Sequence, residues 1–66
     1  MFNFTESSDR YLEAKRNLLV VEIDELKLAI ISENDPMRKN SKEFRLIFAN
    51  LELSDIKTEL HKRGIL

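Results

Sequence analysis

The chain contains one proline, Pro36, and one glycine, Gly64, and this scarcity of chain-breaking residues restricts its fold more than any other feature. Tight turns between antiparallel strands mostly require Asn-Gly, Asp-Gly or Gly-X pairs, and none separates its apolar segments. The β-branched stretch at 20–23 favours a strand when taken alone. Its neighbours, however, are good helix formers with no breaker between them. The pattern therefore predicts an all-α domain.

The length and composition predict a partner chain. At 66 residues there is room for one domain, and chains of this size bury only about 60% of the surface that they expose when unfolded. Small domains are usually reinforced by disulfides, a structural metal or another chain. The sequence has no cysteine and one histidine, which argues against the first two and predicts no metal and no cofactor. Association with another chain is therefore the expected reinforcement.

The first predicted helix runs from about 8 to 33. Thr5, Ser7 or Ser8 can act as its N-cap by accepting a hydrogen bond from a backbone N–H. Nothing interrupts the helical pattern until the turn-forming residues just before Pro36. At 1.5 Å per residue, a helix of about 25 residues is near 38 Å long, which is long for so small a protein.

A second helix is predicted from about 36 to 53. It begins either at Asp35, with proline in the first turn where a missing N–H is harmless, or at Asn40, where a capping box can form. Four apolar residues fall on one of its faces: Phe44, Ile47, Phe48 and Leu51.

A short third helix is predicted from about 55 to 63. Ser54 is its N-cap, and Gly64 ends it in a left-handed conformation. Since Ser54 is also tolerated inside a helix, one bent helix over the whole second half is the alternative. In either case the first helix packs antiparallel on the second, and two copies of the chain are expected to form a dimeric helical bundle.

The apolar residues of the first helix form more than one stripe. Leu12, Leu19, Ile23, Leu26 and Ile30 are spaced 7, 4, 3 and 4 residues apart, which is typical of an inner seam between packed helices. A second stripe contains Tyr11, Ala14, Leu18, Val21 and Leu28. A thinner third stripe holds Val20 and Ile31, beside Asp24 and Lys27.

Two interpretations of the extra stripes remain open. The later helices could wrap around the first and bury a broad face, using nine apolar side chains between Met37 and Leu60. Alternatively these side chains cover about one and a half faces of the long helix, and the second stripe stays exposed. We favour the second interpretation, because exposed apolar patches on soluble proteins tend to mark interfaces. The predicted partner-binding residues are Tyr11, Leu18, Val21 and Leu28.

Charge is divided between the two halves of the chain. Residues 1–35 carry four basic and eight acidic side chains, whereas residues 36–66 carry seven basic and four acidic ones. This opposition suits an antiparallel packing of the halves and also a dimer. The basic side chains are candidate nucleic-acid contacts, although a net charge of −1 weakens that interpretation. They are Arg38, Lys39, Lys42, Arg45, Lys57, Lys62 and Arg63.

The segment Leu53 to Leu66, LSDIKTELHKRGIL, resembles the first helix and turn of SAP-type DNA-binding motifs. The shared features are a capped start, an Ile-Lys-x-x-Leu core and a Lys-Arg-Gly ending. The resemblance covers about 14 of the 66 residues and ends before the second helix of such motifs. It implies that Lys57, Lys62 and Arg63 contact phosphate.

The sequence carries no recognisable catalytic signature. His61 lies near a helix end beside two basic residues, which is typical of a solvated histidine. Ser54 and Asp55 complete the residue types of a catalytic triad, but one short helix cannot direct all three at a substrate. Acidic pairs such as Asp24 and Glu25 lack the glycine-bearing loop of a cation site. We therefore expect no enzyme.

The sequence also lacks a signal-peptide pattern at residues 1–6 and an apolar run long enough to cross a membrane. A cytoplasmic protein is expected. The predicted function is that of a small interaction protein, such as a regulator, inhibitor or adaptor, that docks a helical apolar surface on a partner protein. Two alternatives are a DNA-binding transcriptional regulator and a structural subunit that assembles with itself.

Overall fold

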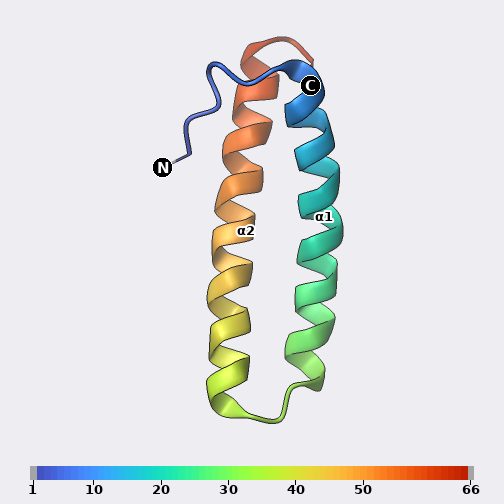
Figure 1. The fold of residues 1–66 in the computed structure, drawn as a ribbon, viewed down its shortest axis with the longest axis vertical. Coiled ribbons are helices and arrows are strands. Elements are labelled where there is room, and N and C mark those ends of the chain that lie inside the picture. Colours follow the sequence, from blue (N-terminus) through green and yellow to red (C-terminus); the bar gives the residue numbers. More distant parts are fainter. Residues whose placement is uncertain (1, 66) are drawn as a thin grey trace.

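A computed structural model describes residues 2–65, and these residues form a helical hairpin (Figure 1). Helix α1 spans Asp9–Ser32, helix α2 spans Pro36–Lys62, and a three-residue loop joins them so that they run antiparallel. No strand occurs among the described residues. The hairpin is long and flat, with extents of 42 × 20 × 14 Å. The prediction of an all-α fold with two antiparallel helices is confirmed.

The helices begin where the capping residues predict. The Ser8 side chain accepts a hydrogen bond from the backbone N–H of Tyr11, and the Asp35 side chain accepts one from Met37 at 2.9 Å. Pro36 occupies the first position of α2. Asn40 lies inside α2 and starts no helix, because the helix already begins at Pro36 with Asp35 as its N-cap.

Helix α2 ends in a Schellman motif, as the glycine predicts. Gly64 has a φ of 78°, its N–H donates to the carbonyl of His61, and the N–H of Ile65 donates to the carbonyl of Leu60. A left-handed residue at this position satisfies carbonyl groups that the end of a helix would otherwise leave unpaired.

The predicted break at Ser54 does not occur, and the structure has the alternative, one helix over the second half of the chain. Helix α2 continues through Ser54, whose backbone carbonyl accepts a hydrogen bond from the Thr58 hydroxyl at 2.9 Å. The physical reason is that one inward seam runs past Ser54 without a change of phase, because its residues are spaced 3, 4, 3 and 4 apart. The seam consists of Leu46, Ala49, Leu53, Ile56 and Leu60.

The core lies between this seam and the predicted inner seam of α1. Leu12, Leu19, Ile23 and Leu26 are buried, and they meet Ala49, Ile56 and Leu60 from α2, with Leu46 and Leu53 partly buried beside them. Ile30, the last residue of the predicted seam, is only half-buried. The small side chain of Ala49 allows the two helices to approach closely at the middle of the hairpin.

The apolar face predicted for the second helix points away from the core. Phe44, Ile47, Phe48 and Leu51 are exposed, and so is Met37. A single helix presents one seam to a single neighbour, and the seam that includes Ile56 and Leu60 takes that place. These five side chains therefore do not cover α1.

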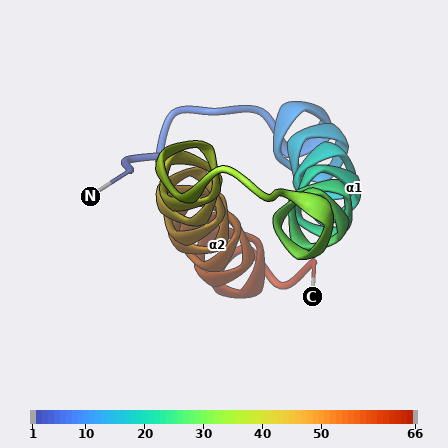
Figure 2. The same cartoon turned by 90° about the horizontal axis from the view of Figure 1, so that it is seen from below.

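Residues 2–8 form an N-terminal segment that arches past one broad side of the hairpin (Figure 2). Phe4 packs against the core, and the ring of Phe2 stacks on it with centroids 6.0 Å apart. The backbone N–H of Phe2 donates to the Asp55 carboxylate at 3.2 Å. The segment therefore adds a third layer over one end of the two helices.

Candidate interaction surface

The four predicted partner-binding residues lie together on the outward side of α1. Tyr11, Leu18, Val21 and Leu28 are between 50% and 68% exposed, and their spacing of 7, 3 and 7 residues keeps them on one side of the helix over about 26 Å. We call these four residues the α1 outer stripe. No other described part of the chain buries them, and whether a partner binds there stays a prediction.

A second exposed apolar surface lies on the outward side of α2. It comprises Phe44, Ile47, Phe48 and Leu51, which we call the α2 outer stripe. Their spacing on one face of the helix was predicted, but they were expected to lie in the core. The signal that could have placed them outward is the phase of Ile56 and Leu60, because a continuous helix cannot turn both sets inward.

The hairpin has two broad faces, and the N-terminal segment lies over part of one of them, which we call the covered face. The covered face carries Phe48, the Asp55 carboxylate that holds the N-terminal segment, and an ion pair of 3.7 Å between Lys15 and Glu52. We call the opposite side the open face. It carries the third predicted stripe, Val20 and Ile31, and both side chains are exposed.

An apolar groove crosses the open face near the loop that joins the helices. Its open volume is about 470 Å³, and most of its lining is apolar. Lys27 from α1 and Glu43 from α2 stand at its two sides. The apolar lining residues are Ile30, Ile31, Leu46 and Ile47.

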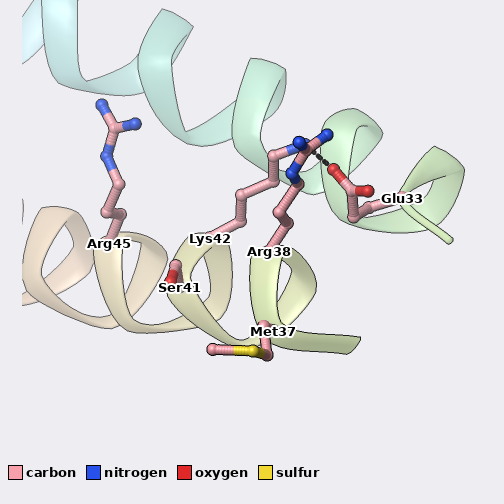
Figure 3. Close-up of a pocket in the computed structure, with 6 residues that line it drawn as sticks. All are labelled: Glu33, Met37, Arg38, Ser41, Lys42 and Arg45. Carbon is pink, nitrogen blue, oxygen red and sulfur yellow. Dashed lines mark hydrogen bonds and ion pairs between the residues drawn. The ribbon is translucent and has the colours of Figure 1, made fainter. Parts of the chain in front are cut away.

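Four of the predicted nucleic-acid contacts lie on the first turns of α2. Figure 3 shows Arg38, Lys42 and Arg45 rising from α2 toward α1, whereas Met37 points away. The Lys42 ammonium donates to the Glu33 carboxylate at 2.6 Å, so the positive charge of Lys42 is already paired within the chain. Lys39 is exposed on the same stretch.

The other basic residues lie toward the opposite end of the hairpin, and one of them holds the fold together. Arg63 donates to the Asp9 and Glu59 carboxylates at 2.7 and 2.9 Å, and to the backbone carbonyls of Phe4 and Thr5 at 3.0 and 3.1 Å. These bonds join the N-terminal segment to both helices. Lys57 and Lys62 are exposed, and Leu66 of the SAP-like segment lies outside the described residues.

The two strongest ionic contacts shift the acid–base equilibria of their members. The hydrogen bond from Lys42, helped by one from the backbone N–H of Asp35, holds the pKa of Glu33 below its ordinary value of 4.5. The hydrogen bonds to Asp9 and Glu59 raise the pKa of Arg63 above its ordinary value. Both effects favour the charged forms, so these contacts persist at neutral pH.

The structure brings no catalytic constellation together among the described residues. His61 is exposed, and it lies two helical turns, about 10.5 Å, beyond Ser54 along α2. Asp55 between them binds the N-terminal segment. Residues 2–65 contain no group of three or more acidic, histidine or cysteine side chains placed to hold a metal ion. Neither helix in this range has the length and apolar character that crossing a membrane requires.

Comparison with known proteins gives no further guide to the surface. No protein-family model matches the chain, and no curated protein and no solved structure is significantly similar to it.

Proposed function

We propose that the chain is a small interaction protein that acts by docking the outward side of α1 on a partner protein, as a regulator, inhibitor or adaptor. The observation that carries the proposal is the α1 outer stripe. Four large apolar side chains lie on one side of α1, which the other described residues leave uncovered. Stripes of this kind are typical of helices that pack against another protein surface.

The contacts that would stabilise the complex follow from the residue types. Val21 and Leu28 form the middle and the far end of the stripe, and their burial removes apolar area from water at about 25 cal/mol per Å². Tyr11 lies at the other end, with an apolar ring and a hydroxyl that can remain hydrated. Aromatic side chains of this kind often contribute much of the binding energy at interfaces.

Capture of the partner from the native cell, with matched variants as bait, tests this proposal. Val21→Asp and Leu28→Asp each place a carboxylate in the stripe, while Asn40→Asp adds the same charge to an exposed polar position of α2, away from the stripe. A partner should be retained by the wild type and by Asn40→Asp and lost from both stripe variants. Helix content measured by circular dichroism confirms that each bait is folded. If no captured protein depends on Val21 or Leu28, the proposal is wrong.

A second candidate function is binding to duplex DNA, and one observation favours it. Arg38 and Arg45 project into the same open groove on α2. A protein that neutralises phosphates must lose affinity steeply as salt increases. Binding to duplex DNA measured at 50 and 200 mM salt, with Arg38→Gln and Arg45→Gln as variants, tests this function. The absence of binding at the lower concentration would exclude it.

A further inference from the structure

Four of the charged side chains on the open face form an ordered pattern, and Arg16 lies half-buried on the same side of α1. Lys27 and Glu43 stand on either side of the apolar groove near the loop. Glu13 and Lys57 each lie fourteen residues, or about 21 Å, further from the loop along their helices. Fourteen residues is close to four helical turns, so each pair on one helix shares a side. One end of the face therefore holds Lys27 beside Glu43, and the other holds Glu13 beside Lys57.

These four charges have no opposite charge within ion-pair distance among residues 2–65. All four side chains are exposed, and none of them takes part in the five ion pairs of that range. The covered face differs, because Lys15 and Glu52 are paired there within the chain. The open face thus keeps its charges available for another molecule.

We infer that the open face is the surface through which two copies of this chain dimerise. A second copy fits because the charge pattern is complementary to itself. A two-fold axis parallel to the helices places α1 of one copy over α2 of its partner, so that Lys27 faces Glu43 of the partner. The same operation places Glu13 opposite Lys57 of the partner. Four ion pairs form in total, two at each end of the face.

The apolar residues between these charges fall at the centre of the same contact. Val20 lies midway between Glu13 and Lys27 along α1, and Ile31 and Ile47 are exposed beside the groove. In this arrangement α2 of the partner covers Val20 and Ile31, and α1 of the partner covers Ile47. An apolar centre with a charged rim is the usual arrangement of a protein interface.

The area of this face also agrees with a second copy as the partner. With extents of 42 by 20 Å, the face offers roughly 800 Å², which matches the usual share of one partner in a stable interface. The accessible surface of the chain is 5017 Å², whereas a folded monomer of 7.8 kDa typically exposes about 4,400 Å². Burial of roughly 800 Å² per copy in the dimer would more than offset this excess.

The charge of the two halves selects the orientation of the dimer. A two-fold axis perpendicular to the helices would also pair opposite charges, because Lys27 would then face Glu13 of the partner. That arrangement, however, lays α1 on α1 and α2 on α2. Residues 1–35 carry a net charge of −4 and residues 36–66 a net charge of +3, so the parallel axis, which places α1 on α2, is favoured.

The dimer is tested first by the mass of the chain at 1–200 µM in analytical ultracentrifugation, with two adjacent substitutions. Val20→Asp places a carboxylate at the centre of the proposed contact and should raise the dimer dissociation constant at least about tenfold. Val21→Asp makes the same change one residue later, on the α1 outer stripe, and should leave it unchanged. A wild-type monomer at 200 µM, or equal effects of the two variants, would overturn the inference.

Charge reversal tests the arrangement itself. Lys27→Glu turns two attractive pairs into repulsive ones and should weaken the dimer about tenfold or more. Adding Glu43→Lys should restore dimerisation to near the wild-type level, whereas adding Glu13→Lys should not. Glu25→Lys, on the outward side of α1, is the control for a change of charge alone. Failure of Lys27→Glu to weaken the dimer, or of Glu43→Lys to rescue it, would contradict the proposed contact. The inference is independent of the proposed partner protein, because it uses no residue of the α1 outer stripe.

Discussion

The two ends of the hairpin are packed very differently, although the same two helices build both. At the end that holds the chain termini, Leu12, Ile56 and Leu60 are completely buried. At the loop end, none of the side chains from 27 to 48 is buried, and Ile30 and Leu46 face each other only half-covered.

The N-terminal segment causes this difference. Two helices side by side leave the edges of each seam accessible from above and below, and a third layer completes the burial. At the termini end Phe4 supplies that layer, held in place by Asp55 and Arg63. The loop end has no such layer within the described chain, and its groove on the open face remains accessible. A second copy would supply the missing layer there.

The largest expected effect comes from truncating leucine at the two ends. Leu60→Ala should destabilise the fold by about 3 kcal/mol, and Leu46→Ala by about 1 kcal/mol, because only Leu60 leaves a closed cavity. Urea unfolding of the monomer at low micromolar concentration measures both. Equal losses would mean that the two ends are packed alike.

Removal of the third layer should reduce the difference between the ends. We expect Phe4→Ala to destabilise the fold by about 1 to 2 kcal/mol, since the ring is partly buried against the core. Phe2→Ala should cost less, because its ring is 41% exposed and stacks only on Phe4. The same urea experiment applies, and a larger loss for Phe2→Ala would contradict the assignment of Phe4 as the core residue.

The role of Arg63 can be separated from its charge by comparison with Arg38. Arg63→Gln should lower the thermal midpoint clearly and speed hydrogen exchange in the first turn of α1, because four hydrogen bonds to the N-terminal segment and both helices are lost. Arg38→Gln removes the same charge but only a 3.9 Å contact with Asp35, and it should change little. Similar midpoints for the two variants would exclude a clamping role for Arg63.

The smallest expected effect concerns the ion pair at the loop end. The pKa of Glu33 is lowered in the folded chain, so the contact stabilises the fold above pH 4.5 and is lost as the pH falls through the lowered value. Glu33→Gln should therefore lower the thermal midpoint slightly at pH 7 and have no such effect at pH 2. A difference of equal size at both pH values would indicate that the carboxylate charge is not involved.

Much of the fold was predictable because its signals are local. The caps at Ser8 and Asp35, the glycine end and the inner seam of α1 each depend on residues within a few turns of one another. The residues predicted to face inward from α2 were the wrong ones, because a helix break was predicted at Ser54. A helix ending there could have turned Phe44 and Ile47 inward, but a continuous helix must keep the phase of Ile56.

The features that escaped prediction depend on distant residues. Phe2 meets Asp55 across 53 positions, and no pattern near either residue announces the contact. The open face likewise requires knowledge of which levels of α1 and α2 lie side by side. The outward position of the α1 outer stripe was predictable, because its residues share one side of a helix whose inner seam was already identified.

The measurement that tests the central claim most directly is a dilution series monitored by methyl NMR of the labelled isoleucine, leucine and valine side chains. As the concentration increases from about 10 µM to 1 mM, the methyl signals of Val20, Ile31 and Ile47 on the open face should shift together along one binding curve. The signals of Leu18, Val21 and Leu28 on the α1 outer stripe should stay in place. Signals on the open face that do not move with concentration, or shifts confined to the α1 outer stripe, would contradict a dimer formed through the open face.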